Sequence, residues 1–202
     1  MRPSDRVVCS HLACRDVDSG AHSVPAIDIA AGHVSVIVVS EAAASRAKDN
    51  YYAADGALFA QTTLQAFRDA GVDAASVAEL LRRGIYFTTA VKCAKTAYGI
   101  QTATVHACSE LLERELALFP NVRAVLLMGD VAIKSLCAIA RRAGEPRPIP
   151  AGSTYRLRGP EYAWRGVRVF PSYLQAGPSF FIEKSKRRMI AEDIAAAMAY
   201  IT

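Results

Sequence analysis

The sequence predicts an α/β protein, a three-layer α/β/α sandwich around a central, mostly parallel sheet of four to five strands. Two observations favour this fold class. Apolar runs of strand length alternate with segments of helical periodicity, and the runs are apolar almost throughout, as in parallel strands that are buried on both faces. The chain has 202 residues, of which 52% are hydrophobic and 21% charged, which is enough for one full core. We therefore expect a single domain covering residues 1–202.

The expected elements alternate in a regular order after residues 1–32, which show little periodicity and are expected to form a loop-rich flap. Strands are assigned to β-branched and aromatic runs, and helices end at stop signals such as Gly84. The expected strands are 33–39, 85–91, 122–128 and 167–170, with a short edge strand at 153–158. The expected helices are 55–70, 75–83, one from Thr102 or Thr104 through Leu116, 131–143 and 182–201.

Four of the five cysteines form two pairs. Cys93 ends a predicted strand and Cys108 lies one turn into the next helix, while Cys9 and Cys14 lie in the flap with four residues between them. We find no signal peptide, and in such a chain these pairs favour a metal or cluster site over disulfides. Zinc pairs are usually closely spaced, so the unequal spacing favours an iron–sulfur cluster; buried structural thiols are the alternative. Cys137, in an apolar helix, is expected in the core.

Charge adds a second indication. The net charge is +5, from 24 Lys and Arg against 19 Asp and Glu, and the basic residues crowd the C-terminal third. A one-sided basic surface suits a phosphate backbone, whereas a solvated helix face is the alternative. No apolar run is long enough to span a membrane, so we expect a monomeric cytoplasmic protein without a membrane partner. The basic cluster at the start of the last helix comprises Lys184, Lys186, Arg187 and Arg188.

Ligands of an open parallel sheet lie outside the carboxyl ends of its strands. Any active site is therefore expected at the edge where four segments meet. These segments are 40–52, 88–93, 129–130 and 171–178.

The motifs in these segments occur in a characteristic order. They are Ser40-Glu41-Ala42-Ala43-Ala44, Asp49-Asn50-Tyr51-Tyr52, Thr89-Ala90-Val91-Lys92-Cys93, Cys108 followed by Leu112-Glu113-Arg114-Glu115-Leu116, Leu127-Met128-Gly129, and Phe170-Pro171-Ser172-Tyr173-Leu174. In this order the chain resembles the iron–sulfur branches of the uracil-DNA glycosylase superfamily, over nearly its whole length.

The resemblance implies an α/β/α sandwich, a 4Fe-4S cluster on the four paired cysteines, and a flipped base at the carboxyl edge of the sheet. It also implies that Glu41 activates or positions the attacking water and that Tyr51 stacks on the base. The asparagine that reads uracil in this family is replaced by Thr89, and the histidine of the last loop by Phe170, or by Leu174 if the loop is shifted. The ligand set implied for the cluster is Cys9, Cys14, Cys93 and Cys108.

Each candidate residue has an alternative role. Glu41 can be a cap or an ion-pair partner instead, Asp49 and Asp55 are backup carboxylates, and Asp55 can equally cap a helix. Tyr51 can simply pack. The base-binding candidates are Ser40, Ala42, Tyr51, Thr89, Ser172 and Tyr173. The hydroxyls of Ser40, Ser172 or Tyr173, or the backbone N–H groups of residues 41–44, can replace the missing histidine.

DNA contacts are expected from two loops and the last helix. Lys92 contacts phosphate or only flanks the cluster. Leu174 and Gln175 lie where a loop can enter the duplex and fill the gap left by the extruded base, although a plain surface turn is the alternative. Lys184, Lys186 and Arg187 are expected on phosphates.

Together these features predict a monofunctional hydrolase that cleaves the N-glycosidic bond of uracil, or of another deaminated or damaged base, in DNA. The loss of the asparagine and the histidine favours the alternative, a non-catalytic binder of damaged or abasic DNA. A zinc-bearing α/β protein is a third, weaker interpretation.

Overall fold

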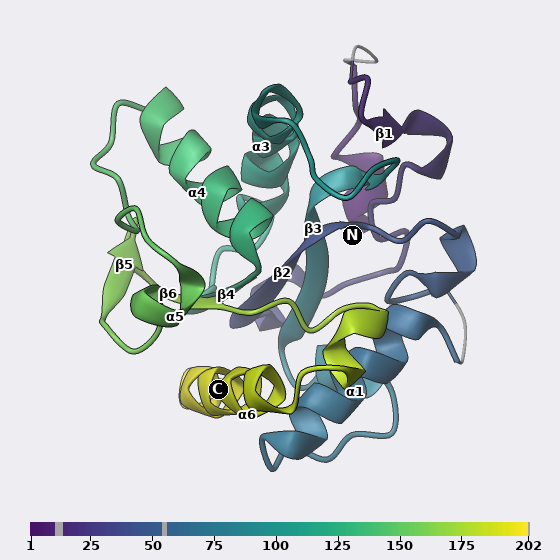
Figure 1. Ribbon diagram of the computed structural model, residues 1–202. Helices are drawn as coiled ribbons and strands as arrows, with labels where there is room; N and C mark the ends of the chain where they lie inside the picture. Colours follow the sequence, from purple (N-terminus) through teal and green to yellow (C-terminus); the bar gives the residue numbers. More distant parts are fainter. Residues whose placement is uncertain (11–13, 54–55, 202) are drawn as a thin grey trace.

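The computed structural model describes residues 1–10, 14–53 and 56–201. At its centre is a six-stranded sheet in the order β1-β3-β2-β4-β6-β5. The four middle strands are parallel, whereas short antiparallel strands pair at both edges (Figure 1). The strands are β1 (Val17–Asp18), β2 (Val36–Ala43), β3 (Ile85–Lys95), β4 (Ala124–Met128), β5 (Tyr162–Trp164) and β6 (Val167–Ser172).

Helices cover both faces of the sheet. In Figure 1, α3 and α4 lie above the sheet and α1 and α6 lie below it. The α-helices are α1 (Leu58–Asp69), α2 (Val77–Arg82), α3 (Thr102–Leu116), α4 (Asp130–Arg142), α5 (Thr154–Leu157) and α6 (Lys184–Met198). The 3₁₀ turns are η1 (Pro3–Asp5), η2 (Ser19–Ala21), η3 (Ala31–His33), η4 (Ala47–Asp49) and η5 (Pro178–Phe181).

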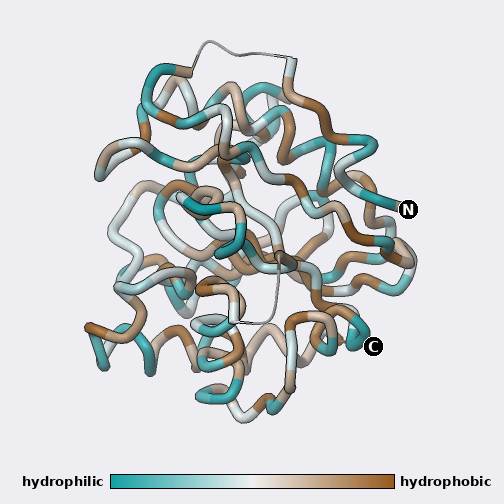
Figure 2. Tube along the Cα trace, turned by 90° about the vertical axis from the view of Figure 1, so that its right-hand side faces the viewer, coloured by the Kyte–Doolittle hydropathy of each residue, from teal (hydrophilic) through white to brown (hydrophobic). Residues whose placement is uncertain are grey.

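Strand periodicity divides the core into two layers. Side chains alternate between the two faces of a strand, so Val36 and Val38 of β2 face the core under α1 and α6, while Ile37 and Val39 face the core under α3 and α4. Figure 2 shows hydrophobic stretches running through the interior and hydrophilic turns around the outside. The two residues that follow in β2, Ser40 and Glu41, continue this alternation and therefore point to opposite faces of the sheet.

The predicted α/β fold class is confirmed, and the elements that position the site lie where the sequence predicts them. The sheet has six strands rather than the predicted four to five, because β1, in the expected flap, also pairs with β3. The predicted edge strand at 153–158 is wrong: this segment contains the helical turn α5, in which Leu157 N donates to Ser153 O at 3.1 Å. The edge strand is instead β5, joined to β6 by a tight turn with Arg165 at φ 49° and Gly166 at φ 79°. Two successive positive φ values are typical of a two-residue hairpin.

Two further predictions concern the start of the first helix and the absence of a membrane-spanning segment. The predicted helix 55–70 is found as α1, and its proposed cap, Asp55, lies outside the described residues. Among the described residues, no helix has the length and apolar character needed to cross a membrane.

Candidate active site

Glu41 lies near the carboxyl end of β2, on the face covered by α3 and α4. Its carboxylate lies against the backbone N–H groups of Asp130 and Val131, the first residues of α4, and these groups oppose the rise of its pKa. Gly129 makes this approach possible: it has φ 103°, and a Cβ there would lie only 2.5 Å from Glu41 Oε1. A carboxylate at a helix N-terminus is stabilised by the helix dipole and by unpaired N–H groups.

The electrostatic surroundings of Glu41 favour its carboxylate as a general base, that is, as a proton acceptor. Burial raises the pKa of Glu41 above its ordinary value, against the opposing effects of Lys95 and of the α4 N–H groups. A carboxylate with a raised pKa is a better proton acceptor near neutral pH than an exposed glutamate. Glu41 thus combines a cap for α4 with a side chain that is suited to acid–base chemistry.

A cavity of about 980 Å³ opens beside Glu41. It extends over the seam between α3 and α4, and Leu174 and the loop after β3 line its mouth. Of the predicted site residues that the structure describes, Glu41 and Leu174 line this cavity, together with Asp130 of the predicted segment 129–130. Cys137, predicted to lie in the core, is half-buried and also lines it.

Ser40, Tyr51 and Gln175 form a buried polar cluster on the other face of the sheet. Ser40 Oγ is hydrogen-bonded to Tyr51 OH and donates to Gln175 Oε1 at 3.2 Å, and Gln175 Nε2 donates to Tyr51 OH at 3.0 Å. The Tyr51 ring packs between Phe59 and Phe87, each at 5.4 Å between centroids, and burial raises its pKa to about 12. Gln175 is fully buried in this cluster and is not at the exposed tip predicted for a duplex-entering loop.

Tyr51 and Thr89 meet at a second, smaller pocket of about 230 Å³. Its other walls are residues 20–27 of the N-terminal flap and the segment around Asn50 and Tyr52. Within the described residues, the Thr89 hydroxyl has no hydrogen-bond partner, so it can contact a ligand there. His22 also lines this pocket, and burial lowers its pKa, which keeps the imidazole neutral near pH 7.

Glu41 and Tyr51 therefore lie at the same edge of the sheet but on opposite faces. Successive residues of a strand point in opposite directions, and Ser40, which contacts Tyr51, directly precedes Glu41. A nucleotide that contacts both must cross the carboxyl edge of β2.

The four predicted cysteine ligands line one cavity of about 170 Å³. Cys93 lies near the carboxyl end of β3, Cys108 comes from α3, and Cys9 and Cys14 come from the flap. Burial, reinforced by the neighbouring thiols, raises the pKa of Cys93 to about 11, and burial also raises the pKa of Cys108. Across the part of the chain that is described, no group of three or more His, Cys, Asp or Glu side chains is arranged to hold a metal ion.

Lys92, predicted to contact phosphate or flank the cluster, is wholly buried. Its ammonium group forms an ion pair with Glu115 of α3 and donates to Thr88 Oγ1 at 2.9 Å. Glu115 Oε1 accepts hydrogen bonds from Tyr86 OH at 2.5 Å and from Thr88 Oγ1 at 2.9 Å. The ion pair connects β3 to α3 beside the cysteines. Because a phosphate cannot reach the buried ammonium group, Lys92 is not a DNA contact.

Other predicted site residues are engaged in the protein itself. Ser172 is fully buried and donates to Asp193 Oδ2, so its hydroxyl is not free for a base. Asp49 pairs with Arg46 at 2.6 Å on the surface loop. Ala42 is buried beside Cys93, in a small apolar cluster. These interactions account for each group without a ligand.

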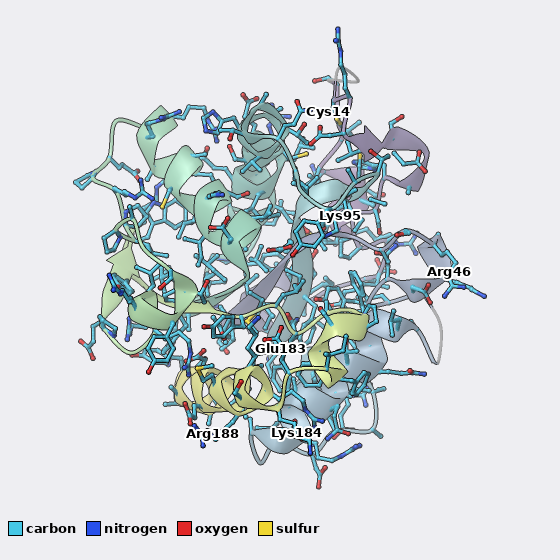
Figure 3. All side chains as sticks on the ribbon, viewed as in Figure 1. Cys14, Arg46, Lys95, Glu183, Lys184 and Arg188 are labelled. Atoms are coloured by element: carbon cyan, nitrogen blue, oxygen red, sulfur yellow. The ribbon has the colours of Figure 1, made fainter. Side chains whose placement is uncertain are left out.

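The predicted basic cluster lies at the start of α6, where Figure 3 labels Lys184 and Arg188. Lys184 is exposed, whereas Lys186 pairs with Glu183 and lies over the Tyr173 ring at 5.4 Å. Arg187 pairs with Asp69 at 2.6 Å. Lys184 is therefore the most available cation of the three predicted for DNA.

Comparison with known families decides the identity of the fold. The family model of the Uracil DNA glycosylase superfamily matches residues 28–194, which include Glu41, Tyr51 and two of the four paired cysteines. The chain belongs to this superfamily. It is also similar to the type-5 uracil-DNA glycosylase of Thermus thermophilus, with 30% identity over 94 residues. That match covers 46% of this chain and 43% of the relative, so the chain spans less than half the length of the curated relative it matches.

Some residues of this superfamily member that line the cavities were missed from the sequence. Lys95, Tyr98, Arg141 and Arg147 all line the large cavity. Position gave a usable signal for Lys95 and Tyr98, because they follow a strand whose carboxyl end faces the site. Arg141 and Arg147 belong to the basic residues that crowd the C-terminal third, but the sequence does not place them at this cavity, because packing between distant segments brings them there.

Proposed function

We propose that this protein is a monofunctional DNA glycosylase that hydrolyses the N-glycosidic bond of uracil, or of another deaminated or damaged base, in DNA. Membership of the superfamily and the similarity to a protein named type-5 uracil-DNA glycosylase support this class of reaction. The observation that carries the proposal is the placement of Glu41, half-buried at the carboxyl edge of β2 with a raised pKa and open to the large cavity.

In this proposal Glu41 holds the attacking water. Its carboxylate is fixed by the α4 N–H groups and by Gly129, so a water bound to its free side is oriented toward the cavity. The carboxylate also faces the positive charge that develops on the sugar as the base leaves. The reaction forms no covalent link to a lysine, so borohydride reduction should trap no protein–DNA adduct.

The base occupies the smaller pocket, across the sheet edge from Glu41. Its volume of about 230 Å³ accommodates one base, and it offers the Thr89 hydroxyl and the neutral His22 ring as polar contacts. Negative charge on the departing base is stabilised by such donors. Because a threonine hydroxyl makes fewer hydrogen bonds than an amide, discrimination between bases is looser than with asparagine. Lys184 at the start of α6 binds a phosphate.

The four cysteines hold a 4Fe-4S cluster. The donor set supports this: four thiols from three separate segments line one cavity, and four cysteine thiolates are the ligand set of a 4Fe-4S cluster. When bound there, the cluster would supply structural cross-linking rather than catalysis, because Glu41 does not line the cysteine cavity. By binding the cluster, the four cysteines connect the flap to β3 and α3. The flap in turn forms one wall of the base pocket.

The test compares excision of uracil by wild type, Glu41→Gln and Asp130→Asn. The substrate is end-labelled DNA with one uracil, cleaved by alkali at abasic sites. Glu41→Gln keeps an oxygen for the α4 N–H groups but loses the base, and we expect a loss of roughly 100-fold or more. Asp130→Asn keeps the backbone N–H beside Glu41 and removes an exposed carboxylate that, among the described residues, pairs with Lys134. Because that charge also raises the pKa of Glu41, rates are compared on the pH plateau, where this variant should stay within about two-fold of wild type. Equal rates for the wild type and Glu41→Gln would refute the role of Glu41.

A second candidate function is a non-catalytic binder of abasic or damaged DNA. The buried Ser40–Tyr51–Gln175 cluster favours it, because Tyr51 is tied into the core by hydrogen bonds rather than presented to a base. Retention of abasic DNA in a gel, without strand scission of uracil DNA by wild type, would support this function over the glycosylase.

A further inference from the structure

The cavity beside Glu41 is much larger than a base requires. It runs along α4 from Asp130 to Arg141, eleven residues or about 16 Å, and continues to Arg147 beyond the helix. At about 980 Å³ it lies at the upper end of the range of ligand pockets. We name it the α3–α4 groove.

The groove is electropositive once its ion pairs are counted. Its acids are compensated: Asp130 pairs with Lys134 at 2.5 Å, and Glu145 accepts from Arg165 and Trp164, both at 2.7 Å. Glu41 is half-buried at one end. Three exposed cations make no ion pair within the described residues, and they are Lys95, Arg141 and Arg147.

An aromatic ring stands at the mouth of the groove. Tyr98 is 99% exposed, in the loop between β3 and α3, and Lys95 Nζ lies 5.8 Å from its centroid and donates to its backbone oxygen at 3.2 Å. A tyrosine exposed to this degree contributes almost nothing to the core. Lys95 is exposed and lies near the centre of the view in Figure 3.

We propose that the α3–α4 groove binds an unpaired DNA strand that adjoins the target nucleotide, with phosphates on Arg141 and Arg147 and a base stacked on Tyr98. A cationic groove with an exposed aromatic is the arrangement that binds single strands, since every unpaired base offers a ring face. A duplex keeps its bases stacked and paired, so it offers no such face. The inference rests on the proposed function only in taking DNA as the ligand.

The test measures binding of a fluorescein-labelled oligodeoxythymidine of about 15 nucleotides, and of a duplex of equal length, by anisotropy over a range of salt. Neither probe contains uracil. We compare Tyr98→Ala with Tyr155→Ala, an exposed tyrosine on α5, and the pair Arg141→Ala/Arg147→Ala with Arg82→Ala/Arg123→Ala at the opposite, amino edge of the sheet.

Wild type should bind the single strand more tightly than the duplex. Tyr98→Ala should weaken single-strand binding roughly five-fold or more at an unchanged salt slope. Arg141→Ala/Arg147→Ala should lower the slope of log K against log salt by about 1.4, since each phosphate contact on a single strand contributes about 0.7. The control variants should match wild type.

The proposal that the groove binds single strands would be overturned if Tyr98→Ala and Tyr155→Ala changed the affinity equally, or if Arg141→Ala/Arg147→Ala left the salt slope unchanged. Its failure is separable from that of the proposed function. If the wild type excises uracil but the groove variants bind DNA normally, the proposed glycosylase function stands and the groove proposal fails. If the protein binds single strands through the groove but excises no uracil, the groove proposal stands and the glycosylase function fails.

Discussion

The buried ion pair between Lys92 and Glu115 supports a quantitative prediction. Both side chains are fully buried, and Glu115 also accepts from Tyr86 and Thr88. Replacing one member leaves the other charge in the core, which typically costs about 3–5 kcal/mol. For a chain of this size, that corresponds to a drop in Tm of roughly 6–20 °C.

The perturbations are Lys92→Met, Glu115→Gln and the double variant. The Glu115→Gln substitution keeps a side-chain oxygen as an acceptor for the Tyr86 and Thr88 hydroxyls, so the double variant removes both charges without stranding either donor. Urea unfolding followed by circular dichroism measures each free energy. Each single variant should lose about 3–5 kcal/mol, and the double variant should lose far less than their sum.

An exposed pair supplies the control. Lys134 and Asp130 have side chains that are 58% and 61% exposed, so Lys134→Met should cost less than about 1 kcal/mol. If Lys92→Met costs as little as Lys134→Met, or if the two single losses simply add in the double variant, the assignment of a buried, coupled pair is refuted.

Four further predictions follow from the site. Gly129→Ala forces a Cβ against Glu41 at a position with φ 103°, so excision of uracil should fall as in Glu41→Gln and urea unfolding should show a loss of about 1–3 kcal/mol; unchanged activity would contradict this geometry. Tyr51→Phe removes the hydroxyl that accepts from Gln175 Nε2, which then keeps only its 3.5 Å bond to Thr63 Oγ1 among the described residues, and should cost about 1–3 kcal/mol in the same unfolding assay, whereas no loss would mean that the cluster is not formed. Cys93→Ser should lower iron per protein and visible absorbance, and Cys137→Ser should not; equal iron in both would remove Cys93 from the ligand set. Burial raises the pKa of Glu41, so the rate of excision should fall on acidification at a higher pH than an ordinary glutamate would give, and the free energy of unfolding should rise as Glu41 is protonated. A pH–rate profile without this acidic decline, or the same decline in Glu41→Gln, would speak against Glu41 as the base.

Local pattern was sufficient for the parts of the site that depend on strand ends. The alternation of apolar strands and helices predicts the parallel sheet, and therefore the edge where Glu41 lies. The position of Cys93 after a strand and of Cys108 early in a helix predicts their convergence, because a strand and the helix that follows it pack together. The flap cysteines join them at one cavity.

The misplaced residues depend on packing between distant segments. Lys92 looked like a surface charge because its partner, Glu115, comes 23 residues later on α3. A signal existed: Glu115 shares a helix face with Cys108 and Leu112, and a carboxylate on an inner face requires a buried partner. Gln175 carried no such signal, since its partners Ser40 and Tyr51 lie 135 and 124 residues away along the chain.

The central claim is that this protein releases a base from DNA. Purified wild-type protein, incubated with DNA that contains uracil, can be assayed by mass spectrometry for free uracil in the small-molecule fraction. We predict free uracil and abasic sites in equal amounts, both strongly reduced in Glu41→Gln. Protein that binds the uracil-containing DNA but releases no free base would contradict the glycosylase directly.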